Sequence, residues 1–195
     1  AARRPALTPS RHTDGSVSAS SLFAVAREAD AAAFGSAVHA ILASVAWWDE
    51  ADAEAGRARL RAAGHAESAL AEALACLRAP SLRAVFSAPP AGPGGTTTEI
   101  WRERTFEIIL DGAWVTGVFD RVHLERRPNG ALEEVTVYDF KTDRLTGTET
   151  EAARELRARY TRQMGLYRRA AAALAGVPPS RVRCVLVPPS GRLPL

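Results

Sequence analysis

The sequence has a single lysine, two cysteines and one methionine among 195 residues. Cys76 and Cys184 are far apart and lack metal-site spacing, so we predict reduced thiols in the core rather than a disulfide framework. No run of 18 apolar residues and no signal peptide is recognised, which argues against a membrane-spanning helix and against export by that route. No Gly-x-x-x-x-Gly-Lys-Ser string occurs, so we expect no ATPase within this piece.

The scarcity of lysine makes Lys141 informative. Every other basic residue is arginine, and alanine is abundant, which indicates a compositional bias toward Ala and Arg. A compact ammonium and a planar guanidinium are not interchangeable, so one retained lysine indicates a task that arginine cannot perform.

Charge is modest overall but uneven along the chain. The net charge is +3, which is too small for a protein that is basic throughout. From residue 149 onward, however, nine Arg stand against three Glu. A basic helix in this part would suit contact with phosphates, and a solvated helix face is the competing interpretation for any single arginine.

The length suits one domain with a sizeable core. We expect a linker or docked arm over residues 1–20 and a single domain over 21–195. Apolar spacing predicts helices over 24–48, 49–63, 67–78 and 149–175. Strand patterns cover 99–110, 114–124, 134–140 and 181–187, with Asp111-Gly112 and Asn129-Gly130 as hairpin signals. The predicted fold is an α/β (α+β) domain with a central mixed sheet, a covering helix and a helical N-terminal part.

Two strands carry the residues of chemical interest. Side chains alternate along a strand, so Asp139 and Lys141 point to one face. Asp120 ends an apolar stretch on the neighbouring strand and offers a second carboxylate. Carboxylates bind hard cations such as Mg²⁺, and an ammonium can stabilise charge on an attacked phosphate. Taken alone, an Asp-x-Lys tripeptide is more often a solvated surface pair.

The companions of this tripeptide occur in a familiar order. Gly117-x-x-Asp120-Arg121, then Asp139-x-Lys141-Thr142, then Tyr160-x-x-Gln163-x-x-x-Tyr167 resembles the RecB-type nuclease domain of the P-D-(D/E)-x-K superfamily. The Gly35-x-x-x-His39 element and Glu103 before Phe106 also resemble parts of that family. The resemblance covers residues 34–187 and implies a restriction-endonuclease-like fold.

The resemblance implies roles for individual residues. Asp120, Asp139 and Lys141 would be catalytic, and His39, Asp120, Asp139 and the Phe140 carbonyl would hold Mg²⁺ or Mn²⁺. Gln163, Tyr167, Tyr160 and Glu103 would contact DNA or support the metal ligands. Because the four-cysteine pattern of related iron–sulfur nucleases is missing, we expect no such cluster.

Some of these residues have simpler explanations. His39 could be an ordinary helix residue, the tyrosines could be core packing, and Glu103 could pair with Arg102 or Arg104. His65 and His123 have no such support, and we assign them no chemical role. Trp47-Trp48 could stack on bases, but packing between helices is the favoured interpretation.

The resemblance also implies a setting. We expect a metal-dependent DNA nuclease domain, excised from a bacterial cytoplasmic helicase–nuclease of the AddA/RecB type that acts in double-strand break repair and recombination. The expected partners are DNA, the helicase portion and an AddB/RecC-like subunit, with no membrane. The alternatives are a catalytically silent DNA- or partner-binding module of the same fold, and a stand-alone exonuclease or restriction-type endonuclease.

Overall fold

The computed structural model describes residues 6–7, 19–90, 95–141, 148–188 and 193–194. Most of the arm expected over residues 1–20 lies outside these ranges, as do Thr142 and Arg192. The chain divides into two compact units, a helical unit of residues 11–88 and a sheet unit of residues 1–10 and 89–195.

The helical unit contains four α-helices within the described residues. They are α1 (Ala19–Ser44), α2 (Ala53–Ala62), α3 (Glu67–Arg78) and α4 (Arg83–Phe86), with 3-10 turns at Glu50–Asp52 (η1) and Pro80–Leu82 (η2). Helix α3 contacts α1, α2 and α4. Leu70, Leu74 and Leu77 lie at helical spacing along α3 and are all buried, so they form its apolar stripe.

Trp48 is part of the packing of the helical unit. Its side chain is buried, and its indole N–H donates to the Glu50 carboxylate at 2.9 Å. Its backbone N–H donates to the Phe86 carbonyl at 2.7 Å. The ring also fills the space beside Gly56, where an added Cβ would lie 2.8 Å from Trp48. Packing, rather than base stacking, therefore accounts for this tryptophan.

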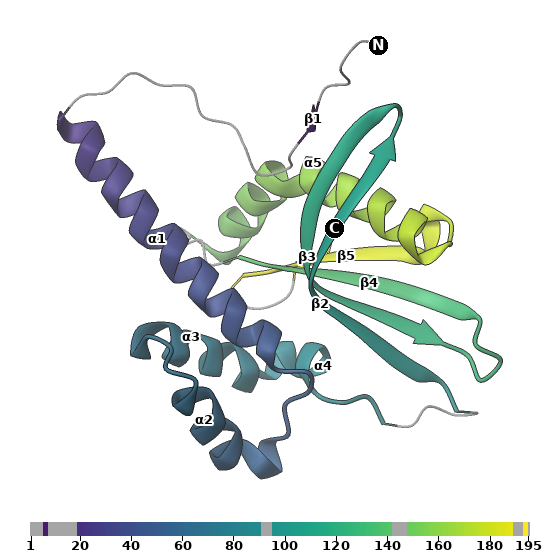
Figure 1. Ribbon diagram of the computed structural model, residues 1–195, viewed down its shortest axis with the longest axis horizontal. Helices are drawn as coiled ribbons and strands as arrows, with labels where there is room; N and C mark the ends of the chain where they lie inside the picture. Colours follow the sequence, from purple (N-terminus) through teal and green to yellow (C-terminus); the bar gives the residue numbers. More distant parts are fainter. Residues whose placement is uncertain (1–5, 8–18, 91–94, 142–147, 189–192, 195) are drawn as a thin grey trace. The chain divides into compact units, whose positions relative to one another are not determined.

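A mixed sheet forms the centre of the other unit (Figure 1). Its long strands are β2 (Thr97–Leu110), β3 (Ala113–Arg126), β4 (Leu132–Phe140) and β5 (Val182–Val187). Strands β2, β3 and β4 pair antiparallel, and β5 pairs parallel with β4. Two short strands, β1 (Ala6–Leu7) and β6 (Leu193–Pro194), pair with β3 and β5. The α/β mixed-sheet fold expected from the sequence is confirmed.

Local sequence explains the ends of these elements. Asp111 and Gly112 have φ of 50° and 76°, and positive φ at both central residues is what a two-residue hairpin turn requires. Helix α5 (Glu149–Ala175) begins with a capping box in which Thr148 and Glu151 bond reciprocally. It ends at Gly176, whose φ of 70° is easily reached only without a Cβ.

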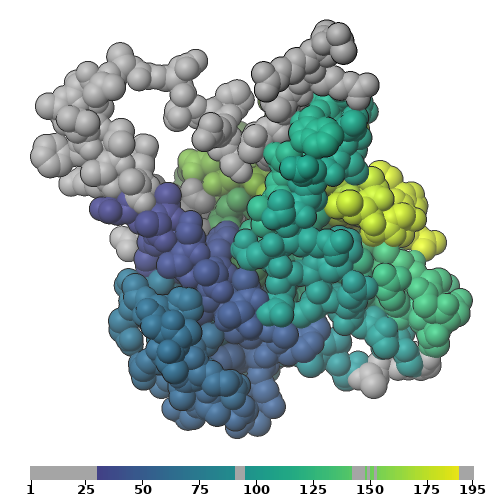
Figure 2. Space-filling view, viewed as in Figure 1, coloured from purple at the N-terminus to yellow at the C-terminus, as the bar shows by residue number. Residues whose placement is uncertain are grey.

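Helix α5 contacts β2, β4 and β5 and closes one face of the sheet. Its buried face includes Leu156, Met164 and Tyr167, which join strand residues such as Val122 and Val137 in one core. Toward its turn, the β2–β3 hairpin, teal in Figure 2, carries exposed apolar side chains at Ile109, Trp114 and Val118. No helix among the described residues has both the length and the apolar character needed to cross a bilayer.

Candidate active site

The buried end of β4 carries an ion pair. Lys141 Nζ lies 2.5 Å from Asp139 Oδ2, and the two side chains are 13% and 3% exposed. The predicted alternation of the strand explains the geometry, since residues two apart share a face. The exposures rule out the solvated surface pair that was the simplest interpretation of an Asp-x-Lys tripeptide.

Helix α5 supplies the other neighbours of Lys141. The ammonium donates to Gln163 Oε1 at 3.4 Å and lies 4.1 Å from the centre of the Tyr160 ring. Gln163 in turn donates from Nε2 to the Tyr167 hydroxyl at 3.1 Å. The structure therefore places the predicted Tyr160 and Gln163 against Lys141 and connects Tyr167 to them through Gln163.

Asp120 lies on β3 and is hydrogen-bonded to the backbone of β4. It is only 9% exposed, and its Oδ2 accepts the Phe140 backbone N–H at 2.7 Å. The β3–β4 register pairs Arg121 with Tyr138, which places Asp120 beside Asp139. Two carboxylates from adjacent strands thus meet where the Lys141 backbone N–H donates to the Val187 carbonyl of β5 at 3.0 Å.

Glu103 faces Asp120 across the β2–β3 pair. The register joins Arg102 to Arg121 and Arg104 to Phe119, so Glu103 and Asp120 stand opposite each other without being paired. A carboxylate oxygen of Glu103 lies within 4.8 Å of one of Asp120. Glu103 has a φ of 44°, a left-handed conformation that is rare for a non-glycine residue in a strand.

At this irregularity, the alternation of side chains between the two faces of the sheet is interrupted on both β2 and β3. On β3 the core contains Phe119 and then Val122, three residues apart, although strict alternation would give two. On β2 the core-facing residues are Phe106 and then Trp101. The alternation of core-facing side chains is therefore broken at Glu103 on β2 and at Asp120 on β3. No signal in the local sequence predicts this break.

The carboxylates of the site affect the pKa of the Tyr167 hydroxyl. Burial and then the charges of Asp139, Asp120 and Glu103 raise the pKa of its hydroxyl well above the ordinary value, while the Gln163 hydrogen bond acts in the opposite direction. The phenol therefore remains protonated and can donate a hydrogen bond. Its ring packs edge-on against Phe106 and Phe119 at 5.9 and 5.3 Å.

Gly117 makes room for this aromatic cluster. An added Cβ would lie 2.7 Å from the Phe106 ring and 3.4 Å from the Tyr167 ring. Phe106 is itself stacked on Phe119 at 4.4 Å. The glycine of the Gly117-x-x-Asp120 string thus allows rings to approach β3 closely, three residues before the carboxylate.

The opposite face of these strands holds a buried polar pair that the sequence did not single out. Arg121 is 1% exposed and donates from Nε to His123 Nε2 at 2.9 Å. The His123 ring packs edge-on against Tyr138 at 4.9 Å. Burial and the nearby Arg102 lower the pKa of Arg121 to about 10. The spacing of Arg121 and His123 by two on one strand was the available signal.

The donor set suits a divalent cation. Glu103 and Asp120 bring two carboxylates within 4.8 Å of each other, and Asp139 brings a third from its place beside Asp120 in the β3–β4 register. Lys141 brings one ammonium. Mg²⁺ and Mn²⁺ prefer such oxygen ligands. His39 lies half-buried on α1 in the helical unit. Its role as a nitrogen ligand stays a prediction, as does that of the Phe140 carbonyl.

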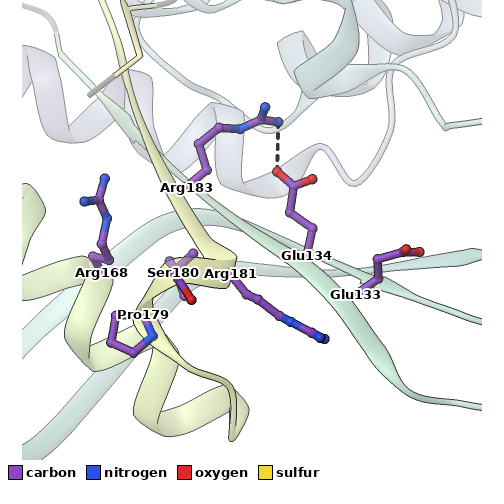
Figure 3. A pocket seen from close by; sticks show the side chains of 8 residues that line it. Glu133, Glu134, Arg168, Pro179, Ser180, Arg181 and Arg183 are labelled. Carbon is purple, nitrogen blue, oxygen red and sulfur yellow. Dashed lines mark ion pairs between the residues drawn. The ribbon is translucent and has the colours of Figure 1, made fainter.

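A hollow of about 530 Å³ lies near the other end of β4 (Figure 3). It is lined by charged residues that include Glu133, Glu134 and Arg183, and Arg183 pairs with Glu134 at 3.2 Å. Because none of the predicted site residues lines it, this hollow is distinct from the carboxylate cluster at Asp139.

The sequence model of the PD-(D/E)XK nuclease superfamily matches residues 17–192, nearly the whole chain. The chain belongs to this superfamily. A comparison with curated proteins returned no match. In a PD-(D/E)XK nuclease, metal-dependent hydrolysis is the chemistry for which a site of two acidic residues and a lysine is suited. Asp120, Asp139 and Lys141 bring two carboxylates and an ammonium of this kind together at the end of β4, and their assignment as the catalytic residues stays a prediction.

Proposed function

We propose that the chain is the DNA-cleaving domain of an AddA/RecB-like helicase–nuclease that processes double-strand breaks, with exonuclease-type action dependent on Mg²⁺ or Mn²⁺. The observation that carries the proposal is the meeting of Asp120, Asp139 and Lys141 at one end of β4 in a PD-(D/E)XK chain. The order of the RecB-type strings, from Gly35 to Tyr167, supports the narrower assignment.

The proposed reaction hydrolyses a phosphodiester. A water oxygen forms a bond to phosphorus and releases one proton to solvent. The bond from phosphorus to the leaving sugar oxygen breaks, and that oxygen takes up one proton from solvent. When bound, a divalent cation lowers the pKa of a bound water and neutralises charge on the phosphate. Asp120 and Asp139 would hold that cation.

Lys141 acts on the phosphate in this scheme. Its ammonium is oriented by Asp139, Gln163 and the Tyr160 ring. A preoriented cation stabilises the charge that grows on the phosphate oxygens in the transition state and needs little reorganisation. The protonated Tyr167 hydroxyl, held by Gln163, offers a further hydrogen-bond donor.

The charge of helix α5 supports DNA as the substrate. Arg157 and Arg162 are exposed on this helix, one turn or less from Tyr160. Arg159 is also exposed and forms an ion pair with Glu155 at 2.7 Å. Exposed guanidiniums beside the site would bind the strand through its phosphates, which makes binding sensitive to salt.

The domain assignment brings further proposals. A P-loop string is missing from this piece, so the helicase would be the portion of the polypeptide that unwinds DNA. An AddB/RecC-like subunit and a cytoplasmic location in bacteria complete the proposed setting.

Cleavage of end-labelled DNA by the purified chain tests the function. We expect cleavage in Mg²⁺ or Mn²⁺ and none in EDTA. Asp139→Ala and Lys141→Ala should each abolish cleavage while the thermal unfolding midpoint stays near that of the wild type. Glu107→Ala removes an exposed carboxylate of β2 and should leave cleavage unchanged.

The substrates should include duplex, single-stranded and frayed DNA, because a helicase normally delivers an unwound strand. If the chain retards these DNAs in a gel but cleaves none of them with either ion, the catalytically silent DNA-binding module is the better assignment.

The role of His39 is tested separately with the two ions. An imidazole nitrogen favours Mn²⁺ over Mg²⁺ more than an oxygen ligand does. If His39 is a ligand, His39→Ala should weaken Mn²⁺ binding more than Mg²⁺ binding in calorimetric titration, and His65→Ala should alter neither. Equal affinities in the wild type and His39→Ala would return His39 to an ordinary helix residue.

A further inference from the structure

Glu103 stands where a third metal-binding carboxylate would be useful. It faces Asp120 in the β2–β3 register, and an oxygen of each carboxylate lies within 4.8 Å of the other. Oxygen ligands of Mg²⁺ lie about 2.0–2.1 Å from the ion, so two of them on one ion are at most about 4 Å apart. A small rotation of an exposed glutamate side chain covers the difference.

The surroundings of Glu103 indicate what its charge does. Its charge adds to those of Asp139 and Asp120 in raising the pKa of Tyr167, so all three carboxylates act on one hydroxyl. Like charges this close repel one another unless a cation lies between them. The neighbouring Arg104 guanidinium lies over the Trp101 ring, 4.0 Å from its centre.

A carboxylate cannot bind DNA phosphates directly, because it would repel them. A carboxylate beside the proposed scissile phosphate can favour phosphate binding through a divalent cation that it shares with Asp120. We infer that Glu103 is a direct ligand of the divalent cation, a third carboxylate beside Asp120 and Asp139. This inference rests on the proposed function, because it concerns the same cation.

The ligand role follows from how the chain presents Glu103. The residue adopts a φ of 44° in the middle of a long strand whose register is the same on both sides. No residue is inserted at this point, so the irregularity alters only the direction of the side chains. It leaves the Glu103 carboxylate beside that of Asp120 rather than in the regular alternation of β2.

Calorimetric titration of Mn²⁺ into the full chain tests the inference. Glu103→Gln keeps the shape of the side chain and removes its charge. We expect its Mn²⁺ dissociation constant to rise by about tenfold or more, in the range seen when groups that support a metal are lost. The matched control is Glu107→Gln, on the same strand and also exposed, which should stay within about twofold of the wild type.

Thermal unfolding separates a ligand from a structural residue. In EDTA, Glu103→Gln should unfold at the wild-type temperature or above it, since a carboxylate repulsion is removed. Saturating Mn²⁺ should raise the unfolding temperature of the wild type more than that of Glu103→Gln. A Glu103→Gln chain with wild-type Mn²⁺ affinity, or one destabilised equally with and without Mn²⁺, would overturn the inference.

The two failures are distinguishable. If the wild type binds Mn²⁺ and cleaves DNA while Glu103→Gln keeps full affinity, only the ligand role of Glu103 is lost. If the wild type binds no Mn²⁺ and cleaves nothing, the proposed function fails and this inference fails with it.

Discussion

Three neighbours hold Lys141 in contacts that suit a compact ammonium. Asp139, Gln163 and Tyr160 surround its ammonium at 2.5, 3.4 and 4.1 Å. A guanidinium is planar and spreads its charge over three nitrogens. Lys141→Arg should therefore reduce the cleavage rate at least about 100-fold, the effect typical of losing a preorganised donor. Initial rates at saturating DNA measure the loss. A variant with more than half the wild-type rate would mean that positive charge alone suffices.

Two glycines of the sheet unit should respond oppositely to an added methyl group. Gly117→Ala forces a Cβ against the buried Phe106 ring, and overpacking of this kind costs about 1–3 kcal/mol. Gly165 lies in α5 with no atom within 4 Å of an added Cβ, so Gly165→Ala should stabilise the chain by about 0.5–1 kcal/mol. Urea denaturation gives both values. Equal effects at the two sites would contradict this account of the Gly117 position.

At the scale of elements, the left-handed backbone at Glu103 lowers the stability of strand β2 and sets the direction of the Glu103 side chain. A left-handed non-glycine residue costs about 1–2 kcal/mol, and glycine avoids most of that cost. Glu103→Gly should therefore match or exceed the wild type in stability by up to about 1 kcal/mol while losing Mn²⁺ affinity. Urea denaturation in EDTA and calorimetry measure the two quantities. A clear loss of stability would show that the Glu103 side chain contributes more to folding than its backbone strain removes.

The predictability of each element followed from how local its determinants are. The bounds of α5 agreed with the sequence because Thr148, Glu151 and Gly176 specify both ends through contacts within the helix. The Asp111-Gly112 turn was equally local. The short strands β1 and β6 and the helix α4 were missed, since two to four residues give no periodicity to detect. The break in alternation at Glu103 was missed because it depends on pairing with β3.

The contacts of the candidate site also divide into those that the local sequence predicts and those that depend on tertiary packing. The proximity of Asp139 to Lys141 follows from side-chain alternation along a strand. The proximity of Asp120 to Asp139 follows from the antiparallel pairing of consecutive strands. The ring of Tyr160 over Lys141 and the bond from Asp120 to the Phe140 N–H need the packing of α5 and the β3–β4 register. These tertiary contacts lie beyond any local pattern, and only the family resemblance indicated Gln163 and Tyr167.

At the scale of the whole molecule, each unit contains one thiol that can report on its unfolding. Burial raises the pKa of Cys76, in the helical unit, and of Cys184, in the sheet unit, to about 11. Only the thiolate reacts with alkylating agents, so both should be nearly inert at pH 8 in the folded chain. Iodoacetamide labelling along a urea gradient should modify Cys76 before Cys184, because Cys76 is partly accessible and Cys184 is fully buried. The reverse order, or rapid labelling without urea, would contradict this.

The parallel pairing of β4 with β5 has a consequence for the newly made protein. Strand β4 leaves the ribosome well before α5 and β5, yet the Lys141 backbone is fixed by the Val187 carbonyl and its side chain by α5. The β2–β3–β4 meander can form early through local contacts, whereas the crossover must wait for about forty more residues, which take seconds to synthesise. A nascent chain therefore carries its acidic residues without the assembled candidate site, and under the proposed function it would gain the capacity to cut DNA only once translation has passed β5.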